Sequence, residues 1–303
     1  MSELRFDGRV AVITGGGRGL GRAYALLLAS RGCKVIVNDP GVTRHGDNTT
    51  EVPAQDVADE IRSRGGEAVA NLDSVSTPEG GQAIIDTAVH NYGKVDIVIN
   101  NAGINVNGPF HEYSWDQFMA TFNVHVGGAF HVTRAAWPLM RDQGYGRIVM
   151  TSSIAGLYTS ATNLAYSVSK AGLMAFSNVL AIEGADHGIK SNAIIPSAVT
   201  RLSEGIDTSN FPKMTPEQVA PTVGWLVHES CTASGEMFVP LAGRLGKAYV
   251  AETRGVWQDE WAIEDIPARL SEIEDTSQQV VFPPFPTGFF DHLNYSFEMA
   301  RGK

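Results

Sequence analysis

Short apolar runs alternate with longer amphipathic segments along most of the chain. Several of the runs are apolar throughout, which is typical of strands that are buried on both faces. The pattern predicts strands at residues 9–14, 34–39, 67–71, 95–100, 146–151, 190–195 and 236–240. Helical length and period predict helices at residues 20–30, 55–64, 78–92, 115–142, 165–184 and 216–228. Strict alternation of this kind predicts right-handed crossovers and a parallel sheet.

The fold class that follows is α/β. We expect a doubly wound, Rossmann-type parallel sheet of about seven strands, with helices on both faces and a C-terminal extension. Residues 1–252 form the nucleotide-binding domain in this prediction and include the substrate site. Residues 253–303 form the extension, and their aromatic side chains argue against a disordered tail: Trp257, Trp261, Phe282, Phe285, Phe289 and Phe290. We expect the extension to pack on the same body or on a partner subunit.

Composition and charge exclude several functions. The 303 residues carry a net charge of −10, so nucleic acid is a poor general partner. Cys33 and Cys231 form no metal-binding or disulfide pattern, and the eight histidines show no paired ligand spacing, so we expect no metal site. No secretory signal and no apolar stretch of spanning length is visible, so we predict no membrane span and a cytoplasmic location.

The first predicted strand leads into a glycine-rich turn. Gly15, Gly19 and Gly21 have the spacing GxxxGxG at the start of the first helix. Glycines allow the chain to turn tightly and to approach a pyrophosphate, which the N–H groups at the helix start can bind. The alternative is a structural turn without a ligand. The Lys-Ser or Lys-Thr pair of a P-loop is missing, which disfavours a nucleoside triphosphatase.

Asp39 ends the second strand, 18 residues after Gly21. A carboxylate at this position can bind both adenosine ribose hydroxyls and repels a 2′-phosphate, which favours NAD over NADP. Arg18 argues mildly the other way, and an ordinary acid at a strand end is the alternative for Asp39. More small or polar residues follow the third and fourth strands, where a ligand of such a sheet binds: Asp73, Ser74, Asn101, Ala102 and Gly103.

Tyr166 and Lys170 lie four residues apart, on one face of a predicted helix. Ser153 follows the fifth strand and lies at the same sheet edge as the glycine turn, while Asn123 lies in the long helical segment after Asn101. A nearby lysine and a positive nicotinamide would favour a tyrosinate, which could remove a hydroxyl proton. Taken alone, a surface tyrosine beside a lysine is an equally good interpretation.

Taken together, the motifs resemble those of the short-chain dehydrogenase/reductase family, across residues 5–250. The resemblance implies that Tyr166 is the acid/base and that Lys170 binds the nicotinamide ribose and lowers the tyrosine pKa. It implies that Ser153 orients the substrate and that Asn123 holds a water that relays protons through Lys170. It also places Leu20, Tyr166, Lys170, Pro196 and Val199 at the cofactor and implies a homodimer or homotetramer. Where the family usually has glycine after Pro196, this chain has Ser197.

A narrower resemblance is to the (3R)-hydroxyacyl-CoA dehydrogenase part of the peroxisomal multifunctional type 2 enzymes. It is carried by residues 4–10, 21–26, 37–39, 132–137, 181–184 and 225–231. It implies an NAD-dependent oxidoreductase that interconverts a small-molecule secondary alcohol, a (3R)-3-hydroxyacyl-CoA, and its ketone. A hydroxysteroid or another alicyclic alcohol is the alternative substrate, and a non-catalytic NAD-binding sensor or scaffold is the alternative of another class. The net negative charge is the main physical argument against an anionic CoA ester.

Overall fold

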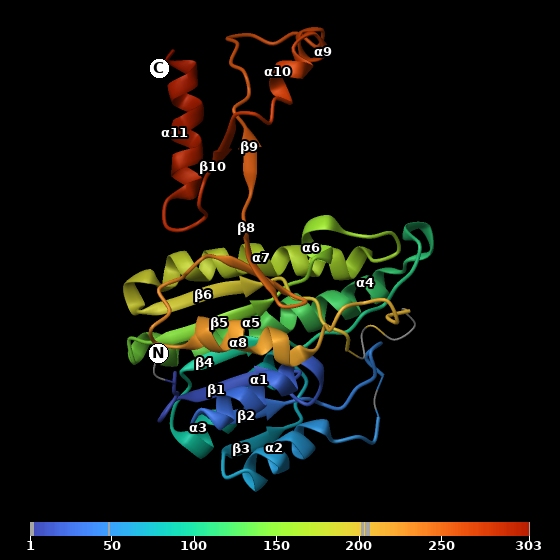
Figure 1. The fold of residues 1–303 in the computed structure, drawn as a ribbon, viewed down its shortest axis with the longest axis vertical. Helices are drawn as coiled ribbons and strands as arrows, with labels where there is room; N and C mark the ends of the chain where they lie inside the picture. Colours follow the sequence, from blue (N-terminus) through green and yellow to red (C-terminus); the bar gives the residue numbers. More distant parts are fainter. Residues whose placement is uncertain (1–2, 48, 201–202, 204–206, 303) are drawn as a thin grey trace. The chain divides into compact units, whose positions relative to one another are not determined.

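The structure is a computed structural model that describes residues 3–47, 49–200, 203 and 207–302. The chain divides into two compact units, Met1–Lys247 and Ala248–Lys303 (Figure 1). The division falls a few residues before the predicted boundary at residue 252. Each unit is considered by itself below.

The larger unit is built on one eight-stranded sheet with the strand order β3-β2-β1-β4-β5-β6-β7-β8. Neighbouring strands from β3 through β7 pair in parallel. The central strands are apolar and buried, as the uniform hydrophobic runs predict. The strands are β1 (Val10–Thr14), β2 (Lys34–Asn38), β3 (Glu67–Asn71), β4 (Ile97–Asn100), β5 (Gly146–Thr151), β6 (Ile189–Ile194), β7 (Met237–Leu241) and β8 (Arg244–Ala248).

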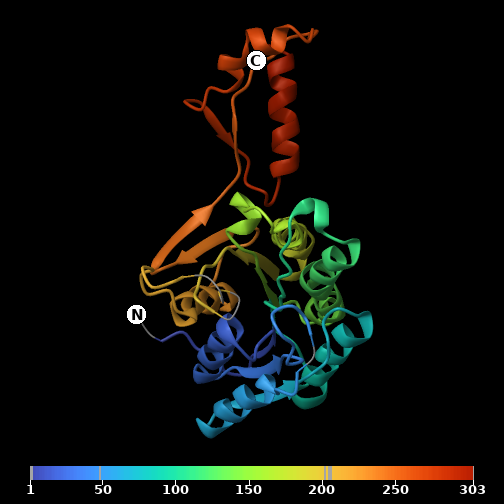
Figure 2. The ribbon, with the colours of Figure 1, turned by 90° about the vertical axis from the view of Figure 1, so that its right-hand side faces the viewer.

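Helices cover both faces of this sheet (Figure 2). On one face α1 packs against α2 and α8, and on the other face α3 packs against α5, and α4 and α6 pack against α7. Their bounds are α1 (Gly19–Ser30), α2 (Pro53–Ser63), α3 (Pro78–Tyr92), α4 (Trp115–Phe122), α5 (Gly128–Asp142), α6 (Ala155–Tyr158), α7 (Leu164–Gly184) and α8 (Pro216–Val227). The doubly wound α/β fold predicted from the sequence is therefore confirmed.

The predicted count of about seven strands is one too low, because β8 follows β7 after a tight turn. Ala242 and Gly243 both have positive φ, at 48° and 81°, which is the conformation of a two-residue hairpin turn. The sequence of β8 is Arg-Leu-Gly-Lys-Ala, and none of its residues is buried. An exposed edge strand lacks the apolar run on which the strand prediction depends.

The helix predicted at residues 115–142 is interrupted. It begins at α4, where Ser114 and Gln117 form a capping box, and continues through a π-helical turn at Asn123–Gly127 into α5. A π-helical turn adds one residue to a helical turn and is frequent at functional sites. The insertion changes which side chains of this segment face α7.

The smaller unit contains two antiparallel strands, β9 (Ala251–Thr253) and β10 (Gln279–Val281), and three helices. The helices are α9 (Asp265–Ala268), α10 (Leu270–Ile273) and α11 (Gly288–Ala300). Phe282 makes edge-to-face contacts with His292 and Tyr295 of α11. Of the predicted aromatics, Phe282 therefore contributes to a folded unit, whereas Trp257, Trp261, Phe289 and Phe290 are exposed. The body on which that unit packs stays a prediction.

At the amino-terminal edge of the larger sheet, one buried carboxylate joins two strands. The Asp96 side chain is 2% exposed and accepts a hydrogen bond from the Val10 amide at 2.9 Å. It also pairs with Arg9 at 3.1 Å and with Lys94 at 3.0 Å. Arg9 makes a second ion pair with Glu229, whose side chain is 64% exposed.

Removing each of these two carboxylates should have very different effects on stability. Asp96→Ala leaves a buried amide without its acceptor and removes a buried partner of Lys94 and Arg9, so we expect a loss of about 2–3 kcal/mol in the free energy of unfolding. Glu229→Ala removes an exposed partner of the same arginine and should cost less than about 1 kcal/mol. Urea denaturation measures both, and equal losses would contradict the assignment.

Candidate active site

The end of β4 is joined to the glycine-rich turn by a set of hydrogen bonds. The Thr14 hydroxyl accepts from the amides of Asn101 and Ala102, at 3.0 and 3.1 Å. The Asn101 side-chain amide donates to the carbonyls of Thr14 and Gly15, at 3.0 and 3.1 Å. Asn101, which is predicted as a cofactor residue, thus holds the turn in place in this structure.

Three positions in and next to the turn favour glycine. Gly15 and Gly19 have φ values of +61° and +51°, which are unfavourable for other residues. A Cβ added at Gly21 would lie 2.1 Å from the Gly15 carbonyl oxygen. Helix α1 begins at Gly19 without a side-chain cap from Arg18, so the first amides of the helix can donate to an anion.

A cavity of about 160 Å³ opens beside this turn and collects most of the predicted cofactor residues. They come from the ends of four strands, as expected for a ligand site in such a sheet. The predicted residues that line it are Gly15, Arg18, Gly19, Leu20, Asp39, Ser74, Asn101, Ala102 and Gly103.

Six predicted cofactor residues do not line that cavity: Gly21, Asp73, Tyr166, Lys170, Pro196 and Val199. Asp73 is exposed, and its carboxylate accepts from the Asn71 side chain at 2.7 Å. Pro196 is buried, and the Val199 side chain is 39% exposed. Ser197, which replaces the usual glycine, has no positive φ and forms a bridge to Leu241, so serine costs no backbone strain there.

The Asp39 carboxylate lines the cavity but is only 7% exposed. Its two oxygens accept from the amides of Gly17 and Gly41, at 3.2 and 2.9 Å, which fix its orientation. The Arg18 guanidinium forms an ion pair with Glu51 and donates to the Val42 carbonyl. Because Glu51 offsets its charge, Arg18 is less suited to bind a 2′-phosphate than an unpaired arginine.

The predicted catalytic residues Ser153, Tyr166 and Lys170 come together. Ser153 follows β5, and its side chain lies close enough to Tyr166 of α7 to lower the pKa of the phenol. The Lys170 ammonium lies 5.3 Å from the centre of the tyrosine ring and donates to the Thr151 carbonyl at 2.7 Å. Spacing on α7 and the end of β5 therefore define one cluster at the carboxyl edge of the sheet.

Burial disfavours the charged forms of both titratable groups in this cluster. It raises the pKa of Tyr166 above its ordinary value of 10.0, and the Ser153 side chain opposes that rise. Burial also lowers the pKa of Lys170 to about 7. The protein alone therefore does not provide the lowered tyrosine pKa that the sequence predicts.

The residue of the π-helical turn that packs against Tyr166 is His125, and not the predicted Asn123. Asn123 is exposed, whereas His125 is 3% exposed and packs edge-to-face on the Tyr166 ring, with 5.3 Å between ring centres. In the sequence, no motif distinguishes His125 from the other histidines. Its spacing matches no metal or nucleophile pattern, and only the π-helical insertion indicates which residues of this segment face the catalytic helix.

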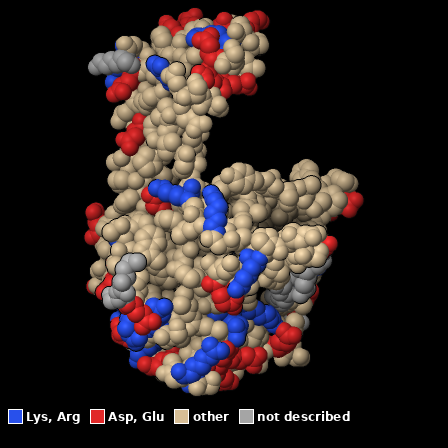
Figure 3. Space-filling view, in the orientation of Figure 1, with Lys and Arg blue, Asp and Glu red and all other residues tan. Residues whose placement is uncertain are grey.

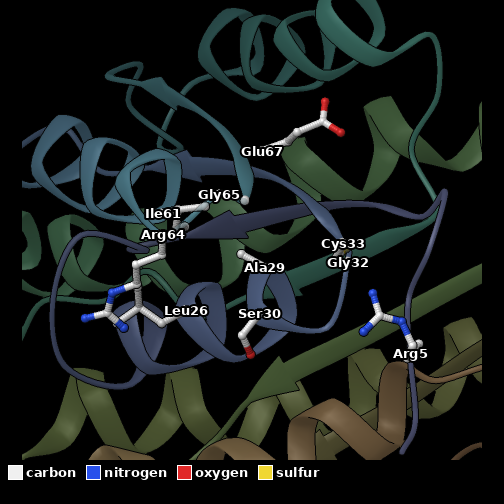
Figure 4. Close-up of a pocket in the computed structure, with 11 residues that line it drawn as sticks. Arg5, Leu26, Ala29, Ser30, Gly32, Cys33, Ile61, Arg64, Gly65 and Glu67 are labelled. Atoms are coloured by element: carbon white, nitrogen blue, oxygen red, sulfur yellow. The ribbon is translucent and has the colours of Figure 1, made fainter.

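A second cavity, of about 350 Å³, lies at the opposite edge of the sheet (Figure 4). It is lined by the ends of α1 and α2 and by the starts of β2 and β3, including Ser30, Cys33, Arg64 and Glu67. Parallel strands bind ligands at their carboxyl ends, so this larger cavity is remote from the predicted chemistry.

A sequence profile of the short chain dehydrogenase family matches residues 9–208. The chain belongs to this family, and it is an oxidoreductase. It is 42% identical over 282 residues to the peroxisomal multifunctional enzyme type 2 of Drosophila melanogaster, covering 91% of this chain and 47% of that protein. The chain thus spans about half the length of that curated relative.

Solved structures agree with this family assignment. The full-length Drosophila multifunctional enzyme type 2 aligns with a TM-score of 0.81 and 34% identity, over 99% of this chain and 51% of that one. A short chain dehydrogenase from Mycobacterium avium aligns with a TM-score of 0.77 and 37% identity, over 88% and 94% of the two chains.

The part of the chain that the structure describes has neither a membrane-spanning helix nor a cluster of metal ligands. Within the described residues, no helix is long and apolar enough to cross a membrane. In the same part of the chain, no three His, Cys, Asp or Glu side chains gather as ligands for a metal ion. Cys33 and Cys231 are both buried and unpaired by any disulfide.

Lys170 should make stability depend on pH in a way that one substitution removes. Its folded-state pKa of about 7 lies below the ordinary 10.5, so between these values only the unfolded chain carries the proton. The free energy of unfolding then rises with pH, by up to about 1.4 kcal/mol per pH unit from this group. From about pH 7 to 8.5, urea denaturation should show the wild type gaining about 1.5 kcal/mol more than Lys170→Met. Parallel pH dependence in the two proteins would contradict the lowered pKa.

Proposed function

We propose that the chain is an NAD-dependent dehydrogenase that interconverts a (3R)-3-hydroxyacyl-CoA and the 3-oxoacyl-CoA. The observation that carries this proposal is the position of the Tyr166 cluster, at the same sheet edge as the glycine turn and Asp39. Hydride transfer from an alcohol requires an acid/base group and a dinucleotide-binding site at the same edge of the sheet. A sensor or scaffold needs the dinucleotide-binding site but has no need of the Tyr166 cluster.

The cavity beside the turn has the features that a dinucleotide needs. Amides at the start of α1 would donate to the diphosphate. A Cβ at Gly19 would meet Thr200 at 3.3 Å, which is tighter than most Cβ contacts. Asp39, fixed by two backbone amides, would accept hydrogen bonds from the adenosine ribose hydroxyls. When bound, NAD supplies the nicotinamide ring that exchanges a hydride with the substrate carbon.

The chain's own residues orient the substrate hydroxyl and transfer its proton. The Ser153 hydroxyl orients the substrate oxygen toward Tyr166, whose pKa it lowers. The Tyr166 oxygen takes the hydroxyl proton in oxidation and returns it in reduction. Lys170, held by the Thr151 carbonyl, places its ammonium where it favours the tyrosinate.

The substrate class rests on similarity and on apolar surface. The relatives named above are multifunctional enzymes or dehydrogenases of this fold. Tyr158 on α6 and Trp115 on α4 are 80% and 71% exposed, on helices that pack against α7. Exposed apolar side chains beside the Tyr166 cluster suit an acyl chain and equally suit a steroid, which remains the alternative substrate.

Charge gives less support to a CoA ester than to its acyl chain. Figure 3 shows basic and acidic side chains interspersed over the visible face, without a continuous basic patch. Of the basic residues near the last strands, Lys247 pairs with Glu236 at 2.7 Å. We propose in addition a homodimer or homotetramer, a cytoplasmic location and no nucleic-acid partner, all of which stay predictions from the sequence.

Substitution of Tyr166 tests the reaction class. Tyr166→Phe keeps the ring but removes the acid/base, so we expect turnover to fall about 100-fold or more while NAD still binds. Reduction of NAD followed optically, with (3R)-3-hydroxyacyl-CoA esters of several chain lengths and with steroid alcohols, measures activity and substrate class together. Turnover of steroids alone would replace the proposed substrate, and undiminished activity of the variant would contradict the role of Tyr166.

Substitution of Asp39 tests the choice of cofactor. Asp39→Ala removes the acceptor for the ribose hydroxyls and the repulsion of a 2′-phosphate, so NAD should bind about 10-fold more weakly and NADP more tightly. Calorimetric titration with each cofactor measures both changes. Arg18→Ala is the matched control variant. A wild type that prefers NADP, and loses this preference in Arg18→Ala, would contradict the assignment of Asp39 as the residue that selects NAD.

A further inference from the structure

We infer that His125 is a positioning residue of the Tyr166 cluster, which orients the Tyr166 ring and keeps a neutral imidazole, with Nδ1 as a free hydrogen-bond acceptor, in the neighbourhood of Lys170. The inference deepens the proposed function and rests on it. It assigns work to a buried histidine that the proposed reaction does not otherwise use.

The tautomer of His125 follows from its contacts. Nε2 lies 2.8 Å from the Ile104 carbonyl oxygen, which can only accept, so Nε2 carries the hydrogen. The other ring nitrogen, Nδ1, is then a lone-pair acceptor. Among the described residues, Nδ1 is a buried polar atom without a hydrogen-bond partner. A buried polar atom of this kind in a native protein calls for an explanation, such as a functional role or a bound water.

The His125 ring is fixed from two sides. Its edge-to-face contact with Tyr166 has an interplanar angle of 88°. On its other side lies Gly103, where an added Cβ would be 2.4 Å from the ring's Cε1. Gly103, predicted as a cofactor residue, therefore also makes room for the imidazole. A ring held this tightly can fix the direction of the tyrosine side chain.

The charge that faces His125 is that of Lys170. Burial and the Lys170 ammonium both lower the pKa of His125, so the imidazole stays neutral at neutral pH. Tyr166 and Lys170 are the titratable groups of α7 beside it, and the loop after β4 contributes the uncharged Gly103 and Ile104. A neutral acceptor near Lys170 favours the ammonium, and the ammonium in turn favours the tyrosinate.

Two variants separate this role from simple packing. His125→Leu keeps the bulk but removes both nitrogens, so the ammonium of Lys170 is less stable and the pKa of Tyr166 rises. We expect kcat for alcohol oxidation to fall about 10-fold near pH 7 and to recover as the pH is raised, with KM changed less than twofold. His125→Gln offers a donor and an acceptor on one side chain and should restore most of the loss.

The outcomes that overturn the proposal are distinct from those of packing. An equal loss for the leucine and glutamine variants at every pH would mean that His125 only fills space. A large loss in Asn123→Leu without one in His125→Leu would give the role to Asn123. Wild-type rates in His125→Leu at all pH values would remove any role for this residue.

A measurement without substrate keeps the inference testable if the proposed function fails. Nitrogen-15 NMR of the histidine rings should show one ring that stays neutral, with hydrogen on Nε2, at pH values where an ordinary histidine is already protonated. The NMR titration of Lys170 should move to lower pH in His125→Leu. A charged His125 at neutral pH, or an unchanged lysine titration, overturns the inference. Absence of turnover with all substrates would affect only the proposed function.

Discussion

The site depends first on the hydrogen bonds that join the glycine turn to the end of β4. Thr14 accepts two amides from the β4 loop, and Asn101 returns two hydrogen bonds to the turn. These bonds connect segments more than eighty residues apart in the chain, and they fix where the backbone amides of α1 point. The strand order places β1 and β4 side by side, so the sheet itself brings the two partners within reach.

The second half of the site is built on α7, where burial disfavours the charged forms of its two titratable side chains. Tyr166 and Lys170 are both less readily charged than in water. An isolated pair of this kind would be a poor base at neutral pH. Neighbouring polar groups make up part of the difference, because Ser153 lowers the pKa of the tyrosine and the Thr151 carbonyl accepts a hydrogen bond from the lysine. A positively charged nicotinamide would supply further stabilisation of the tyrosinate, which couples the acid/base to a bound cofactor.

Much of this arrangement could be predicted from the sequence because it depends on local patterns. Uniform apolar runs indicated the buried strands, and the Tyr166–Lys170 spacing indicated one helix face. The edge strand β8 could not be predicted, since it has no buried residue. His125 could not be predicted either, because the π-helical turn that directs it toward Tyr166 has no clear sequence signature. The amides that hold Asp39 come from backbone geometry, which residue types do not reveal.

The central claim is that one extended site runs from Asp39 past the glycine turn to Tyr166. A crystal structure of the chain with NAD bound tests it most directly. The account predicts ribose hydroxyls on the Asp39 carboxylate, the diphosphate over the first amides of α1, and the nicotinamide within reach of Tyr166 and Lys170. A dinucleotide bound elsewhere, for example in the cavity beside Arg64 and Glu67, or one bound with its nicotinamide at Asp39, would contradict the account.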